Sequence, residues 1–307
     1  MDIFLQQLIN GLTLGSIYAL VALGYTMVYG ILGLINFAHG EVVMIGALSS
    51  LTFVRLLENS GLPGPLVLLV GLVLAALVCM TLGFAIERVA YRPLRNAPRL
   101  APLITAIGVS IVLQQLAMLI WGRSYHSVPA LLPTGQHELF GASFTDVQVV
   151  IVAAAALTMG GLMLLVNRTR MGRAMRATAE NPAIAGLMGV DANRVISLTF
   201  IIGSALAALA GVLVSANYGI AHYHMGFILG LKAFTAAVLG GIGNLAGAMV
   251  GGVLLGLIEA LGAGYIGDFT GGVLGSHYQD VFAFFVLIVV LIFRPSGLMG
   301  EKVAERA

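Results

Sequence analysis

Residues 36–42 read Asn-Phe-Ala-His-Gly-Glu-Val and lie inside an otherwise largely apolar run from Ile3 to Val54. A bilayer-spanning helix needs roughly 20 apolar residues, which this run exceeds. An ionisable residue within a membrane is costly, and its default interpretation is a functional site. The stretch therefore predicts a membrane protein with a polar site inside its spans. The candidate pathway or gating residues here are Asn36, Phe37, His39, Gly40 and Glu41.

Composition supports a membrane protein throughout. The 307 residues are 59% hydrophobic and 9% charged, whereas ordinary globular chains carry about 25% charged residues. Apolar stretches cover 5–35, 66–86, 101–121, 147–166, 195–216 and 281–293, with a long glycine-rich block at 227–262. We expect one all-α polytopic transmembrane domain over residues 1–307, a bundle of about eight to ten helices. The block at 227–262 is either two helices or a re-entrant pair.

The distribution of positive charge predicts orientation. Twelve of the fifteen Lys and Arg residues fall in three segments: Arg88, Arg92, Arg95 and Arg99; Arg168, Arg170, Arg173, Arg176 and Arg194; and Arg294, Lys302 and Arg306. The positive-inside rule places all three in the cytoplasm, including the C-terminus, and places the loop at 122–146 outside. The first Lys or Arg is Arg55. We therefore expect an outward N-terminus and a retained first span rather than a cleaved signal.

The second basic loop, residues 167–194, is too long for a simple connection between helices. A helix-like stretch from Met171 to Leu187 is interrupted by Asn181-Pro182, and proline favours the first turn of a helix. We expect a second short helix there, ending near Gly189 as a C-cap. This helix is a candidate docking surface on the cytoplasmic face. A surface helix without a partner is an equally good interpretation.

Two similar segments suggest broken helices. Gly33-Leu-Ile-Asn-Phe-Ala38 and Gly241-Ile-Gly-Asn-Leu-Ala246 both read Gly-x-x-Asn-x-Ala within apolar blocks. Paired interruptions in two halves of a transporter indicate an internal repeat with the pathway between the halves, although so short a match also arises by chance. Asn244, Lys232 and Glu259 thus join the pathway candidates. The alternatives are structural hydrogen bonds or ion pairs and, for Lys232, snorkelling to an interface.

Polar residues also mark the span at 101–121. Thr105, Gly108, Val112 and Gln115 share one helix face, with Ser110 and Gln114 beside it. Most such residues in membrane spans form helix–helix hydrogen bonds.

Motifs of enzymes are missing from the sequence. The nearest approach to a phosphate-binding loop is Gly226 to Ala233, where the spacing is wrong and alanine replaces the magnesium-binding Ser or Thr. Neither a His-Glu-x-x-His motif nor a Gly-x-Ser-x-Gly motif occurs. Cys79 is the only cysteine, which excludes an intrachain disulfide and a multi-cysteine metal site. We predict no catalytic residue, no metal, no cofactor bound by this chain and no nucleic-acid surface.

Four segments carry a resemblance to a known family: Ile35-Asn-Phe-Ala-His-Gly-Glu-Val42, Glu87-Arg-Val-Ala-Tyr-Arg-Pro93, Arg170-Met-Gly-Arg-Ala174 and Lys232-Ala-Phe-Thr-Ala-Ala-Val-Leu-Gly-Gly-Ile-Gly243. Together they resemble the branched-chain amino acid ABC importer permeases of the LivH/BraD type, over nearly the whole chain. Related urea and short-amide importers have a segment similar to the first, so a urea or short-amide permease is the nearest alternative.

The resemblance implies a multi-pass subunit of a bacterial inner membrane that translocates leucine, isoleucine, valine and other neutral amino acids. It would pair with a second, homologous permease as a heterodimer, two cytoplasmic ATPase subunits that use ATP and magnesium, and a periplasmic amino-acid-binding protein.

Permeases of ABC importers dock their ATPase through a loop of pattern Glu-Ala-Ala-x-x-x-Gly. In this chain Ala185 and Gly189 match, Ala183 occupies the position of the glutamate, and Glu180 lies one turn earlier. The predicted coupling loop also includes Arg173 and Arg176.

A stand-alone ion-coupled transporter is the competing class. It would use Glu41 and Glu259 as coupling sites and would leave the long basic loop without a role.

Overall fold

The computed structural model describes residues 2–95, 97–98, 100–133, 135–139, 141–269, 271 and 278–300. Within these residues, seven helices are long and apolar enough to cross a membrane: α1 (Asp2–Leu32), α2 (His39–Leu57), α3 (Gly64–Ile86), α4 (Leu100–Trp121), α5 (Asp146–Arg168), α8 (Ala192–Tyr218) and α10 (Leu245–Phe269). Two shorter apolar helices are α9 (Met225–Gly240) and α11 (Gln279–Phe293). The expected all-α polytopic fold is confirmed, and the block at 227–262 is two helices, α9 and α10.

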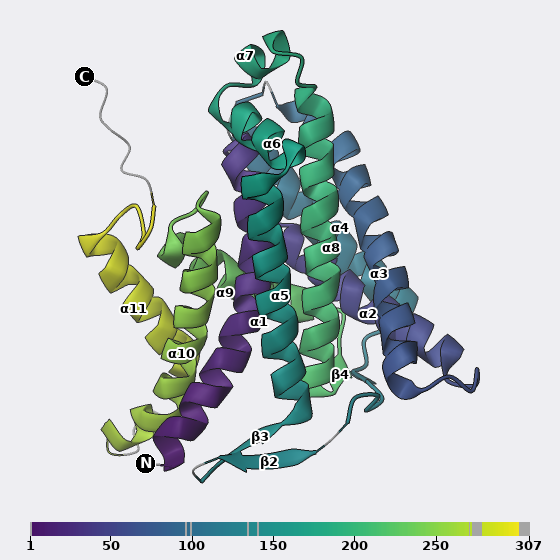
Figure 1. Ribbon diagram of the computed structural model, residues 1–307, viewed down its shortest axis with the longest axis vertical. Helices are drawn as coiled ribbons and strands as arrows, with labels where there is room; N and C mark the ends of the chain where they lie inside the picture. The colour runs from purple at the N-terminus through teal and green to yellow at the C-terminus, as the bar shows by residue number, and fades with distance from the viewer. Residues whose placement is uncertain are drawn as a thin grey trace.

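The short elements gather at the two ends of the bundle. Figure 1 shows α6 (Arg170–Glu180) and α7 (Pro182–Leu187) at the top, and β2 (Gln136–Leu139) and β3 (Ala142–Thr145) at the bottom beside the N-terminus. We call these the basic end and the hairpin end. The π-helical turn η1 (Glu87–Tyr91) and the 3-10 turn η2 (Arg92–Leu94) follow α3 and contact the start of α8, so they also lie at the basic end. Of the predicted basic residues, Arg99, Lys302 and Arg306 lie outside the described residues.

The connection between α4 and α5 contains strands that the sequence did not predict. Strands β2 and β3 form an antiparallel hairpin in which Gln136 pairs with Thr145. Strand β1 (His126–Ser127) pairs with β4 (Ile220–Ala221), which follows α8. These strands tie the predicted external loop to the α8–α9 connection, so the loop is a structured cover over the hairpin end.

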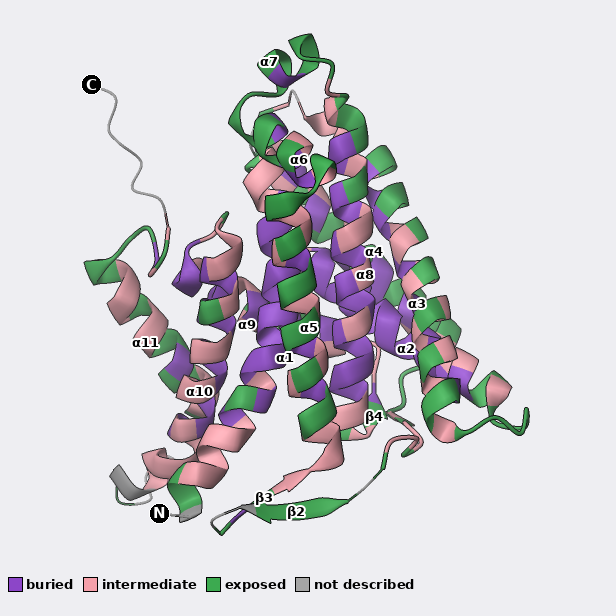
Figure 2. Ribbon diagram, in the orientation of Figure 1, coloured by how far each residue is buried: buried purple, intermediate pink, exposed green. Residues whose placement is uncertain are grey.

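Helix α1 forms the centre of the bundle. Figure 2 shows it buried along much of its length, whereas α5 and α3 present exposed faces at the periphery. Gly11 and Gly15 of α1 face Gly252 and Gly256 of α10, and a Cβ at Gly256 would lie 2.2 Å from the Gly15 nitrogen. Membrane helices have little hydrophobic force between them, so small residues allow the close packing that holds them together. Glycine therefore fixes the α1–α10 crossing.

Both Gly-x-x-Asn-x-Ala segments lie between consecutive helices. Gly33 follows α1 with φ +64°, and Gly241 follows α9 with φ +108°, values that strongly favour glycine. The Asn36 side chain accepts a hydrogen bond from the Ala38 nitrogen at 3.2 Å, and the Asn244 side chain accepts one from Gly247 at 3.0 Å. The two segments thus share one local role: glycine ends a helix and asparagine binds free backbone N–H groups at the next.

Candidate translocation site

Glu41 lies in the first turn of α2, where its side chain is buried between helices. Its Oε1 atom accepts hydrogen bonds from Ser110 Oγ at 3.1 Å and Gln114 Nε2 at 2.7 Å, both on α4. Its Oε2 atom is buried and has no hydrogen-bond partner among the described residues. One carboxylate oxygen therefore links α2 to α4, while the other is left without a hydrogen bond.

The unpartnered oxygen faces the crossing of α2 and α9. A Cβ at Gly226 would lie 2.9 Å from Glu41 Oε2 and 2.4 Å from the Gly40 carbonyl oxygen. A Cβ at Gly40 would lie 2.9 Å from the Gly230 Cα. The three glycines bring the start of α2 and the start of α9 into backbone contact beside a polar group that lacks one partner. A small relative movement of these helices would change the surroundings of Glu41.

His39 fills the space between three helices. Its ring packs edge-on against Tyr25 with centroids 5.0 Å apart. A Cβ at Gly24 of α1 would lie 2.1 Å from its Nε2 atom, and one at Gly203 of α8 would lie 3.9 Å from its Cε1 atom. The imidazole therefore occupies the room that two glycines leave. Phe37 packs nearby against Phe234 of α9, with ring centroids 5.6 Å apart.

Lys232 and Glu259, far apart in sequence, form an ion pair between α9 and α10. Lys232 Nζ lies 2.6 Å from Glu259 Oε1 and 2.8 Å from Asp280 Oδ1 of α11. Tyr18 of α1 donates a hydrogen bond to Glu259 Oε2 at 3.0 Å. The Glu259 side chain is 3% exposed and that of Lys232 15%. Four helices thus meet at one charged cluster, and Lys232 does not snorkel away from it.

A cavity of about 340 Å³ opens next to this cluster, between α1, α8 and α9. Leu, Ile, Val and Met make up about half of its lining, and the residues with polar groups are Tyr18, Tyr125, Tyr218, His222, His224 and Lys232. Tyr125 and His222 stack at 4.3 Å between ring centroids and also line it. Because His222 lies just after β4, the cavity belongs to the hairpin half of the bundle. An apolar cavity with a few polar groups is the usual form of a small-molecule site.

The predicted coupling loop folds into α6 and α7 as expected. Asn181 caps α7 through hydrogen bonds from the Ala183 and Ile184 nitrogens at 3.0 and 3.1 Å. Gly189 follows the helix with φ +85°. Ala183 is exposed but Ala185 is buried, so Ala185 does not belong to the outer surface.

The outer surface of α7 is apolar. Ile184 is 58% exposed, and Leu187 and Met188 are 87% and 81% exposed. These three residues were not predicted from the sequence, although their apolar character in a loop rich in arginine was a usable signal. Arg173, Arg176 and Glu180 of α6 are exposed, and the Arg176 guanidinium donates to the Val166 carbonyl oxygen.

Helix α6 packs against the broken part of the bundle. A cavity of about 100 Å³ separates Met175 and Arg176 of α6 from Gly30 of α1 and from Gly243 in the α9–α10 break. The exposed helix α7 follows α6 directly. The two helices therefore connect the surface of the basic end with a break in the membrane bundle.

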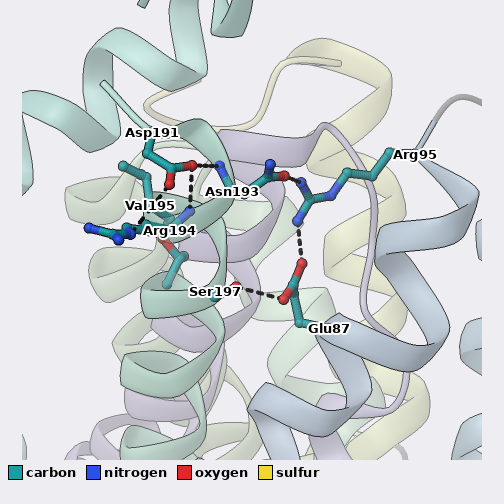
Figure 3. Close-up of polar contacts among 8 residues, drawn as sticks. Glu87, Arg95, Asp191, Asn193, Arg194, Val195 and Ser197 are labelled. Atoms are coloured by element: carbon teal, nitrogen blue, oxygen red, sulfur yellow. Dashed lines mark hydrogen bonds and ion pairs between the residues drawn. The ribbon is translucent and has the colours of Figure 1, made fainter. Parts of the chain in front are cut away.

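A polar network that the sequence analysis did not identify holds the basic end together (Figure 3). The fully buried Glu87 binds the Arg95 guanidinium and accepts a hydrogen bond from Ser197 Oγ at 2.6 Å. Arg95 also donates to Asn193 Oδ1 at 2.6 Å. Burial lowers the pKa of the Arg95 guanidinium, and the Glu87 carboxylate opposes that shift. The network fixes η1 and η2 against the start of α8.

The described residues contain no group of three His, Cys, Asp or Glu side chains that could hold a metal ion. Cys79 is buried and its thiol donates to the Val42 carbonyl oxygen at 3.5 Å. What the bundle does contain is buried ionisable groups at helix crossings, together with helix breaks and an apolar cavity. These features are typical of polytopic membrane proteins that transport small molecules.

Sequence comparisons identify the family. The family model described as branched-chain amino acid transport system / permease component matches residues 7–291, and the chain belongs to this family. It is 49% identical to the high-affinity branched-chain amino acid transport system permease protein BraD of Pseudomonas aeruginosa, over 99% of this chain and 98% of that protein. It is 48% and 47% identical to the LivH permease proteins of Escherichia coli K12 and Salmonella typhimurium, each over 99% of this chain and 97% of the relative.

Proposed function

We propose that this chain is the permease subunit of an ABC importer that carries leucine, isoleucine, valine and other neutral amino acids across a bacterial inner membrane. The observation that carries this proposal is the near-50% identity to BraD and LivH proteins over almost the full length of both partners. The cavity between α1, α8 and α9 agrees with this proposal, because its mainly apolar lining suits the aliphatic side chains of leucine, isoleucine and valine.

The cavity between α1, α8 and α9 is the proposed entry to the pathway. Its aliphatic lining would receive the branched side chain, and Tyr18, Tyr218 and Lys232 would supply the polar contacts for the amino and carboxylate groups. Deeper in the bundle, the α2–α9 crossing at Gly40 is the proposed gate. Its backbone-to-backbone packing leaves no room for substrate until the helices separate.

ATP hydrolysis takes place in partner chains in this proposal, and α7 receives the resulting motion. The exposed side chains of Ile184, Leu187 and Met188 form an apolar surface that water does not favour, and such surfaces mark protein interaction sites. Because α6 borders the same small cavity as the end of α1 and the α9–α10 break, a displacement of α7 and α6 would change the space around Gly243. The assembly would include two ATPases, a second homologous permease and a periplasmic binding protein.

The double variant L187S/M188S tests the docking role of α7. Both side chains are more than four-fifths exposed, so the bundle should keep its stability while ATP-driven leucine uptake and co-purification of the ATPase both fall at least tenfold. The matched control is Leu56→Ser, at the C-terminal end of α2 on the hairpin end, where the side chain is 73% exposed. Unchanged ATPase co-purification with L187S/M188S would remove α7 from the proposal.

A further inference from the structure

A groove of about 450 Å³ lies at the basic end, where η1 and η2 meet the first turns of α8. Its apolar lining comes from Phe84 at the end of α3 and from Leu198 and Ile201 of α8. Phe84 is 43% exposed and Leu198 42% exposed. The groove therefore continues onto the apolar outer surface of α3 and α8, which a bilayer would cover.

The polar lining of the groove is strongly basic. Arg88, Arg92 and Arg194 supply three guanidinium groups, and Asp191 is the single carboxylate among the described lining residues. Asp191 pairs with Arg194 at 3.4 Å and caps α8 by accepting from the Asn193 nitrogen at 3.0 Å. Arg88 and Arg92 form no ion pair with a carboxylate of the described residues. Three positive charges against one negative leave a net charge of +2.

The groove has a fixed floor. Asn193 and Ser197 line it and also belong to the Glu87–Arg95 network of Figure 3. Because Glu87 is completely buried and precedes Arg88 directly, the network holds the backbone that carries the free arginines. Arg95 is itself neutralised by Glu87, so Arg88 and Arg92 remain available for an external anion. The positive charge is thus presented on a rigid framework.

We propose that this groove binds the phosphate headgroup of an anionic membrane phospholipid, with the first methylenes of an acyl chain along Phe84 and Leu198. Guanidinium groups bind phosphate oxygens in bidentate fashion. Basic pockets between membrane helices on the cytoplasmic side suit anionic lipid headgroups. A free phosphate ion would use the same arginines but would leave the apolar half of the groove empty. The combination of charge and apolar lining therefore favours a lipid.

Native mass spectrometry of the purified full-length chain in detergent tests this proposal. The probes are phosphatidylglycerol and phosphatidylethanolamine with identical acyl chains, and inorganic phosphate as competitor. Each lost arginine should weaken phosphatidylglycerol binding about fivefold, and R88Q/R92Q about 25-fold. Phosphatidylethanolamine binding should not change. The control R168Q/R170Q removes two exposed arginines of the other basic loop, outside the groove, and should bind phosphatidylglycerol like the unmodified chain.

Three results would overturn the proposal. Equal binding of the two lipids by the unmodified chain would mean that headgroup charge is not recognised. Undiminished phosphatidylglycerol binding by R88Q/R92Q would place the lipid elsewhere. Complete displacement of phosphatidylglycerol by millimolar phosphate would identify the groove as a site for a free anion. Retained binding of phosphatidylethanolamine by R88Q/R92Q serves as the check that the variant is folded.

Discussion

Replacing Lys232 by methionine should destabilise the bundle more than replacing Glu259 by glutamine. Without the Lys232 ammonium, the 3%-exposed Glu259 carboxylate keeps the Tyr18 hydroxyl as its only donor among the described residues. Removing one partner of a buried ion pair costs about 3–5 kcal/mol, because a buried charge is left uncompensated. In Glu259→Gln the lysine keeps the Asp280 carboxylate at 2.8 Å. That variant loses a charged hydrogen bond, at a cost of about 1.5–3 kcal/mol.

The double variant K232M/E259L tests the same ion pair by replacing both partners with apolar residues. It removes both buried charges, and Asp280, which is 42% exposed, can remain solvated. Replacing a buried ion pair by apolar residues is often neutral, so the remaining cost should be the unsatisfied Tyr18 hydroxyl, about 1–3 kcal/mol. The assay is the free energy of unfolding from SDS titration in mixed micelles. If E259Q is as damaging as K232M, or if the double variant is worse than either single variant, the reasoning is wrong.

Two further predictions use the same assay. Gly256→Ala should lower the free energy of unfolding by about 1–3 kcal/mol, because the new Cβ would lie 2.2 Å from the Gly15 nitrogen. Gly108→Ala is the matched control, with nothing within 4 Å, and should stabilise by about 0.5–1 kcal/mol; equal effects would contradict the packing argument. Asn36→Ala should cost about 1–3 kcal/mol, since its side chain binds the Tyr91 hydroxyl at 3.0 Å. Adding Tyr91→Phe should recover part of that cost, and a further loss would contradict this role of Asn36.

The fold followed from hydropathy because a bilayer allows few alternatives. A long apolar segment must satisfy its own peptide groups and therefore forms a helix. The sequence also predicted both helix breaks. The glycine and asparagine residues at 33–36 and 241–244 suit the end of one helix and the start of the next. The hairpin at 136–145 was missed because its strands are short and polar, and the hydropathy signal that identifies spans does not register them.

Side-chain partners were harder to predict than helices. Thr105, Gly108, Val112 and Gln115 share a face of α4, yet the buried polar residues of this helix are Ser110 and Gln114, and Gln115 is exposed. Periodicity gives the members of a face, but neighbouring helices decide which face is buried.

The charged cluster shows the same limit. Lys232 and Glu259 were both candidates, but nothing in a single sequence indicates that their helices bring them together. Asp280 was missed because it lies in the first turn of an apolar helix. The helix dipole favours an acidic residue there, so its presence did not indicate an ion pair. The Glu87 network was missed for a related reason: Glu87 and Arg95 come from the connection between α3 and α4, and their partners Asn193 and Ser197 lie more than 90 positions later, at the start of α8.

The most direct test of the proposed function is leucine uptake into proteoliposomes that hold this chain with the partner permease, the ATPases and the binding protein. Each component is omitted in turn. We predict uptake that requires ATP and stops when the ATPases or the binding protein are left out. Accumulation of leucine by this chain alone, driven by an ion gradient, would contradict the account and would make Glu41 and Glu259 the coupling sites to examine.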